Sequence, residues 1–111
     1  MSKTRRQQLI DEAMAMLLPN IPLAYALTIR HSTAQGALRT APPYRAVRLA
    51  AIALARHQFT GYDAMLQQGY DRDAARFFVQ EDMCMQLQEW GLTIAPNEFE
   101  NIDGDTNDTP Q

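Results

Sequence analysis

The chain has 111 residues, of which 46% are apolar and 21% are charged, values typical of a single globular domain with one modest core. Its longest apolar run, Leu49 to Ala55, is far shorter than the roughly 18 to 20 residues that span a bilayer, so we expect no membrane partner. The N-terminus lacks the apolar stretch of a secretory signal, which predicts a cytoplasmic protein, and the net charge of −3 weighs against a nucleic-acid partner.

The first predicted helix covers residues 5–18, where apolar side chains recur at helical spacing. Either Thr4 or Ser2 can cap its start, and Pro19 ends it because proline cannot continue a helix. A second helix is predicted over residues 22–32. These two elements form the N-terminal part of the predicted bundle.

Residues 32–43 have no apolar period and are predicted to form a loop, with room for one helical turn near Ala37. The third helix, Tyr44 to Gln58, is rich in alanine, which leaves little side-chain bulk and lets neighbouring helices approach closely. We therefore expect this helix to lie at the centre of the fold.

The next predicted element is a short helix that Thr60 and Asp63 can cap as a variant of the capping box and that ends at Gly69. Asp71 is predicted to cap the last helix, Arg72 to Trp90. Apolar residues spaced by one turn predict the core stripe of that helix: Ala75, Val79, Met83, Leu87 and Trp90.

These elements predict an all-α fold, a compact single bundle of four to five helices over residues 1–95. The sequence then changes to an acidic stretch rich in Asn, Asp, Thr and Pro without periodicity. Residues 96–111 are therefore predicted to be a flexible, disordered acidic tail.

Charge is distributed unevenly along the chain, with a net +6 over residues 1–57 and −9 over the remainder. Arg45, Arg48 and Arg56 share one side of the third helix, and Arg39 of the preceding loop can extend this basic stripe. We predict that these four arginines bind a partner, because arginine is enriched at interface hot spots. The alternative is that the acidic tail neutralises the stripe within the molecule.

A second group of candidate residues surrounds the turn after the third helix: His57, Thr60, Tyr62 and Asp63, with Arg56 beside them. This mixture could hold an anion or transfer a proton near neutral pH. A structural role in capping and packing is the favoured interpretation, because the residues that hydrolysis needs, a nucleophile beside a base or a second carboxylate, are missing from the turn.

Arg76 falls within the apolar stripe of the last helix, and an arginine in such a position needs a carboxylate partner. Asp63 is preferred over Asp73, which points away from Arg76 on the same helix. We therefore predict an Asp63–Arg76 ion pair that ties the turn to the last helix.

Cys84 is the single cysteine, and His31 and His57 are the only histidines. This inventory excludes an intramolecular disulfide and provides no Cys/His cluster at zinc spacing, so neither a metal nor a cofactor is predicted. Cys84 is interpreted as a small hydrophobe that is buried or half-buried.

The run RHQFTGYDAMLQQGYDRDAARFFV, Arg56 to Val79, is followed by the pattern M-x-L-x-x-W-G. This part of the chain resembles a bacterial family, the domain of unknown function numbered 2293. The resemblance covers roughly residues 8–91 and is strongest over Arg56 to Gly91. It implies one compact helical domain and supplies no activity, cofactor or catalytic residue.

The absence of a catalytic motif and the uneven charge favour a non-enzymatic protein-interaction module, an adaptor or small inhibitor of the kind found in phage and mobile elements. Its partner is expected to be a larger protein, and a homodimer is a further possibility that the sequence does not exclude. One alternative is a nucleic-acid-associated protein that uses the Arg45, Arg48 and Arg56 stripe. A weaker alternative is an enzyme centred on His57 and Asp63.

Overall fold

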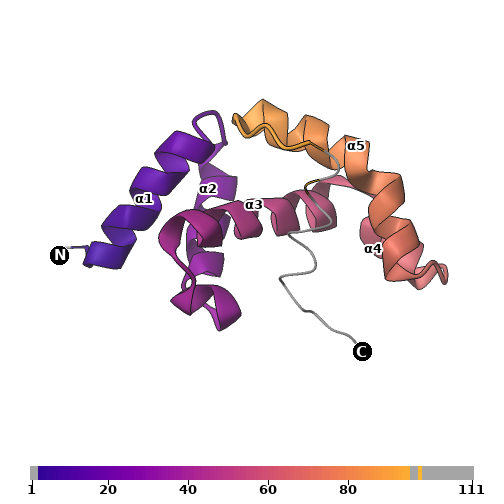
Figure 1. Cartoon of the computed structure of the whole chain (residues 1–111), viewed down its shortest axis with the longest axis horizontal. Helices are drawn as coiled ribbons and strands as arrows, with labels where there is room; N and C mark the ends of the chain where they lie inside the picture. Colours follow the sequence, from indigo (N-terminus) through magenta and orange to yellow (C-terminus); the bar gives the residue numbers. More distant parts are fainter. Residues whose placement is uncertain (1–2, 96–97, 99–111) are drawn as a thin grey trace.

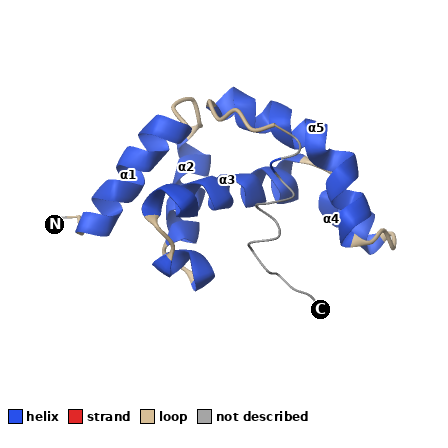
Figure 2. Cartoon of the chain, in the orientation of Figure 1, coloured by secondary structure: helices blue, strands red, loops and turns tan. Residues whose placement is uncertain are grey.

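The computed structural model describes residues 3–95 and residue 98, and within these residues all regular secondary structure is helical, with no strand (Figures 1 and 2). It comprises five α-helices and one short 3-10 helix, η1: α1 Arg5–Leu17, α2 Leu23–Thr33, η1 Gly36–Thr40, α3 Pro43–Phe59, α4 Tyr62–Gln67 and α5 Arg72–Trp90. The all-α prediction is confirmed. The predicted tail, residues 96–111, lies outside the described residues apart from Glu98.

The predicted caps at Thr4 and Asp71, which depend only on residues within the first turn of each helix, are present in the structure. Thr4 and Gln7 close a complete capping box at the start of α1, and the Asp71 carboxylate accepts a 2.8 Å hydrogen bond from the Ala74 amide at the start of α5. The predicted loop contains the helical turn expected near Ala37, in the form of η1. No helix in the described part of the chain is both long and apolar enough to cross a membrane.

Helix α3 lies at the centre of the molecule and contacts α1, α2 and α5, and in the view of Figure 1 α1 lies to its left and α4 to its right. Its alanines at positions 46, 50, 51 and 55 are buried, as are Val47 and Ile52. Small side chains on several sides of one helix let three neighbours approach it, which gives the predicted central position of α3 its physical basis.

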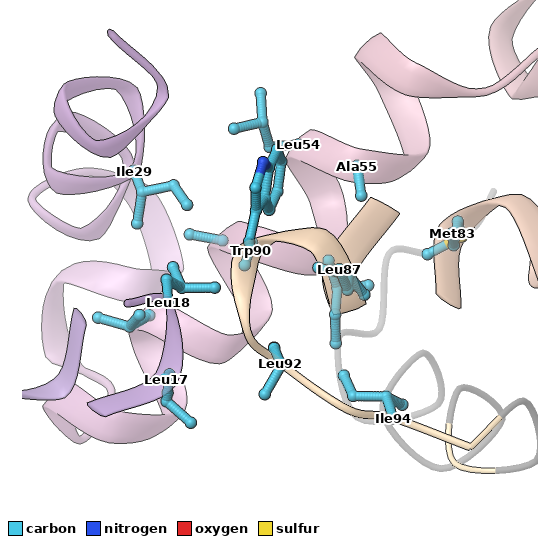
Figure 3. Packing of buried hydrophobic residues seen from close by; sticks show 14 of the residues in the cluster. Leu17, Leu18, Ile29, Leu54, Ala55, Met83, Leu87, Trp90, Leu92 and Ile94 are labelled. Carbon is cyan, nitrogen blue, oxygen red and sulfur yellow. The ribbon is translucent and has the colours of Figure 1, made fainter. Parts of the chain in front are cut away.

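The core converges on the C-terminal end of α5, where Trp90 and Leu87 lie close to Leu92 and Ile94 of the following segment (Figure 3). The Trp90 ring also packs edge-on against Phe59 of α3, with ring centres 5.4 Å apart. The Trp90 carbonyl accepts a 3.0 Å hydrogen bond from the Asn20 amide. These contacts join the end of α5 to α3 and to the turn between α1 and α2.

Helix α5 ends in a Schellman motif. The Leu92 amide donates to the Leu87 carbonyl at 2.9 Å, and the Gly91 amide donates to the Gln88 carbonyl at 3.0 Å. Gly91 has a φ of 105°, and a Cβ at this position would lie 2.5 Å from Cδ of Pro19. Both the left-handed backbone and the close approach of Pro19 therefore require glycine here.

Candidate functional site

The predicted polar residues do come together at the turn between α3 and α4. Nδ1 of His57 lies 2.7 Å from Oδ1 of Asp63, and the His57 ring packs edge-on against Tyr62 with ring centres 5.5 Å apart. The guanidinium carbon of Arg56 also lies against Tyr62, 5.5 Å from the centre of its ring. Tyr62 is buried, so its ring serves as the packing centre of the cluster.

Thr60 fixes the turn itself. Its hydroxyl donates to the Arg56 carbonyl at the end of α3 and accepts a 3.2 Å hydrogen bond from the Tyr62 amide at the start of α4. The predicted capping box is wrong in its partners: the side chain of Thr60 accepts from residue 62 rather than residue 63, and Asp63 pairs with His57 instead of reaching back. The Thr60 hydroxyl therefore links the end of α3 to the start of α4, as a donor to the first and an acceptor from the second.

A histidine paired with a carboxylate can transfer protons, and the His57 and Asp63 side chains are 49% and 53% exposed. The surrounding contacts nevertheless give structural roles to Thr60, Tyr62 and Arg56. Within residues 3–95 and 98, no group of three His, Cys, Asp or Glu side chains is placed to hold a metal ion.

The predicted Asp63–Arg76 ion pair is replaced by two other pairs. Asp63 bonds to His57, and Nη1 of Arg76 lies 4.0 Å from Oδ1 of Asp73, a fully exposed carboxylate. The reason is the short connection between α3 and α4, which keeps the last turn of one helix beside the first turn of the next. Asp63 is thereby held on the α3 side, with His57.

The four predicted partner-binding arginines are not equally exposed. Arg39 and Arg45 are exposed, whereas Arg48 is half-buried and its Nη2 lies 2.8 Å from Oε1 of Glu98. Arg56 is only 8% exposed. A helical wheel places Arg56 on the same side of α3 as Arg45, but the turn into α4 brings Tyr62 over that end of the helix.

Sequence reasoning missed an exposed aromatic cluster on α5 and the turn before it. Phe77 and Phe78 are 66% and 57% exposed, and their ring centres lie 5.7 Å apart. Tyr70 packs edge-on against Phe78 at 5.9 Å, and Met85 is exposed two turns further along the helix. We call Tyr70, Phe77, Phe78 and Met85 the aromatic face.

The sequence did contain a signal for this face. The core stripe of α5 runs from Ala75 to Trp90, and at about 100° per residue Phe77 lies roughly 140° from the centre of that stripe. Because the stripe is buried in the structure, Phe77 has to point outward. Two adjacent phenylalanines off the core stripe therefore indicate an exposed apolar surface.

Cys84 is half-buried, and its Sγ donates to the Ile94 carbonyl at 3.2 Å. Burial raises the pKa of the thiol, and the nearby carboxylates of Glu81 and Glu98 raise it further. The thiol is therefore protonated at neutral pH, in agreement with a packing role.

A protein-family model described as "Uncharacterized conserved protein (DUF2293)" matches residues 4–91, which include all five helices and the aromatic face. Searches of curated proteins and of solved structures gave no match. Since the family model covers most of the sequence, the chain belongs to the DUF2293 family.

Proposed function

We propose that this protein is a non-enzymatic interaction module, an adaptor or small inhibitor, that binds a larger protein through the aromatic face of α5. The observation that carries the proposal is the contiguous exposure of Phe77 and Phe78, with Tyr70 packed against them. Exposing large aromatic rings to water is unfavourable, and contiguous apolar patches on small domains mark binding surfaces.

The chemistry of the rings supports a protein partner. Aromatic side chains are enriched among interface hot spots, where a few large residues supply most of the binding energy. The two edge-to-face contacts hold Phe78 between Phe77 and Tyr70, so the rings lose little further freedom on binding. Leu23 and Leu27, one turn apart on α2, are also exposed, but exposed leucines are ordinary on a protein surface.

The charges on α5 define what the partner should present. Five acidic residues and two arginines occupy positions 71–90, and the exposed acids on the helix include Glu81, Asp82 and Glu89. We therefore expect an apolar groove bordered by basic residues on the partner, because complementary charge at the rim raises the association rate and the specificity. The same acidic helix would repel nucleic acid, so that partner would have to use another surface.

The test is affinity capture from native cell extract with the tagged full chain, compared between two double variants. Phe77→Ser with Phe78→Ser removes the rings of the aromatic face, and Leu23→Ser with Leu27→Ser removes two exposed apolar side chains from α2. We expect the first variant to lose the captured protein and the second to retain it, with both showing helical circular dichroism. Equal capture by all three proteins would place the binding surface elsewhere.

The competing hypothesis is that a second copy of this chain covers the aromatic face and forms a homodimer. Light scattering coupled to size exclusion separates the two cases at several protein concentrations. A measured mass equal to one chain supports the proposal that the aromatic face binds a different protein. A mass of two chains that falls to one in the Phe77→Ser, Phe78→Ser variant would show that the face is covered by a second copy, which would overturn the proposed partner.

A further inference from the structure

We infer that a pocket between α1, α2 and η1 binds a small molecule through its phosphate group. The pocket has a volume of about 380 Å³, within the range of sites that hold small molecules. Arg6, Arg30 and Arg39 line it together with His31, and none of its lining residues is acidic. It lies at the N-terminal end of the molecule, away from the aromatic face, and the inference is independent of the proposed protein partner.

Arg6 supplies a fixed positive charge at this pocket. Its Nη1 donates to the Ala41 carbonyl at 2.8 Å, and its Nη2 donates to the carbonyls of Leu38 and Thr33 at 2.7 and 3.3 Å. All three acceptors are neutral, and no carboxylate of the described residues lies within ion-pair distance of this guanidinium. The Arg6 guanidinium therefore holds the loop that carries η1 through neutral carbonyl groups, which do not neutralise its positive charge.

The remaining charges of the region do not neutralise it. Among the residues that the structure describes, Asp11 is the carboxylate that pairs with these groups, and it is shared between Lys3 and Nε of Arg30, which lies 3.0 Å away. Residues 3–41 as a whole carry five Lys and Arg side chains against two acids, a net charge of +3. This excess of positive side chains around the pocket favours an anionic ligand over a cationic one.

Arg39 is the residue best placed to recognise the ligand. Its side chain is exposed on η1 and lines the pocket, and within the described part of the chain it makes no ion pair. A guanidinium has a planar fork of donors that matches two oxygens of a phosphate group. Thr33 and Gln7 add polar groups to the wall, and Ile10 adds an apolar surface that an organic portion of the ligand can cover.

The experiment is titration calorimetry of the full chain with inorganic phosphate and with glycerol phosphate, at an ionic strength held with chloride at about 150 mM. We compare Arg39→Gln with Arg5→Gln. Arg5 is exposed and adjacent to Arg6 on α1 but does not line the pocket, so its loss changes the net charge equally. We expect saturable binding that Arg39→Gln weakens by about tenfold and that Arg5→Gln leaves within about twofold.

Two outcomes would overturn the inference. One is the absence of saturable binding to either phosphate compound by a folded chain. The other is equal weakening by Arg39→Gln and Arg5→Gln, which would show a general attraction of anions to a basic surface. A tighter affinity for glycerol phosphate than for inorganic phosphate supports an organic phosphate as the ligand, and the reverse supports the free anion.

Discussion

Nη2 of Arg48 lies 2.8 Å from Oε1 of Glu98, which joins the central helix to a residue fifty positions later in the chain. This contact gives Arg48 of the basic stripe a counter-charge within the molecule. The two side chains are 29% and 46% exposed, so the pair is screened by water and contributes little to stability. The segment before Glu98 contributes more to stability than this pair does, because Leu92 and Ile94 are buried.

This difference predicts where the folded domain ends. A chain shortened after Ala95 loses Glu98 and should retain its thermal midpoint to within a few degrees, because an exposed pair contributes about 0 to 1 kcal/mol. A chain shortened after Gly91 also loses Leu92 and Ile94, each of which stabilises the fold by about 1.5 to 3 kcal/mol through burial. Thermal unfolding followed by circular dichroism measures both. Equal midpoints for the two shortened chains would contradict the structure of this segment.

Gly91 should be far less tolerant of substitution than Gly69. Both have a left-handed backbone, with φ values of 105° and 102°, but a Cβ at Gly69 would meet no atom within 4 Å, whereas one at Gly91 would lie 2.5 Å from Pro19. Gly69→Ala should cost about 1 to 3 kcal/mol from backbone strain alone, and Gly91→Ala about 1 to 3 kcal/mol more from the clash. Urea unfolding of the two variants isolates the clash. The close approach of Pro19 is refuted if both lose the same free energy.

At the turn after α3, Thr60 should matter more for stability than the His57–Asp63 pair. Thr60→Val removes the hydroxyl that links the Arg56 carbonyl to the Tyr62 amide, with an expected loss of about 1 kcal/mol. Asp63→Asn weakens a half-exposed pair and should lower the free energy of unfolding by less than that. The urea midpoints of the two variants decide the order. A larger loss for Asp63→Asn would assign the pair a main structural role.

Cys84 should react slowly with thiol reagents in the folded protein. Its pKa is raised by burial and by Glu81 and Glu98, so the reactive thiolate is depleted at neutral pH and increases only as the pH rises toward the shifted value. Alkylation by iodoacetamide at pH 8 should be at least about tenfold slower than in urea. The rate should then increase with pH in the folded protein. Equal rates in the folded and unfolded chains would contradict the partial burial of Cys84 and its hydrogen bond to the Ile94 carbonyl.

Local signals in the sequence predicted most of the helical framework. Thr4, Asp71 and Gly91 mark helix ends through bonds to residues three or four positions away, so their roles do not depend on the rest of the fold. The alanines of α3 predicted the central helix for a different reason, because small side chains let neighbouring helices approach closely. The predicted bounds of α5, Arg72 to Trp90, agree with the structure.

The errors arose where the answer depends on how helices pack. The burial of Arg56 and the pairing of Asp63 with His57 both follow from the direction in which α4 leaves α3, which no helical wheel contains. The contact between Arg6 and the η1 loop joins residues about thirty positions apart and has no sequence pattern. By contrast, exposure of Phe77 and Phe78 could have been predicted from the core stripe.

The most direct test of the proposed interaction is amide hydrogen exchange of the full chain with and without its captured protein partner. The aromatic face lies on residues 70–85, whereas exposed Arg39 and Arg45 lie on η1 and the start of α3. We predict slower exchange over residues 70–85 in the complex, with residues 39–48 unchanged. Slower exchange over residues 39–48, with residues 70–85 unchanged, would contradict the account and assign the interface to the basic side of the molecule.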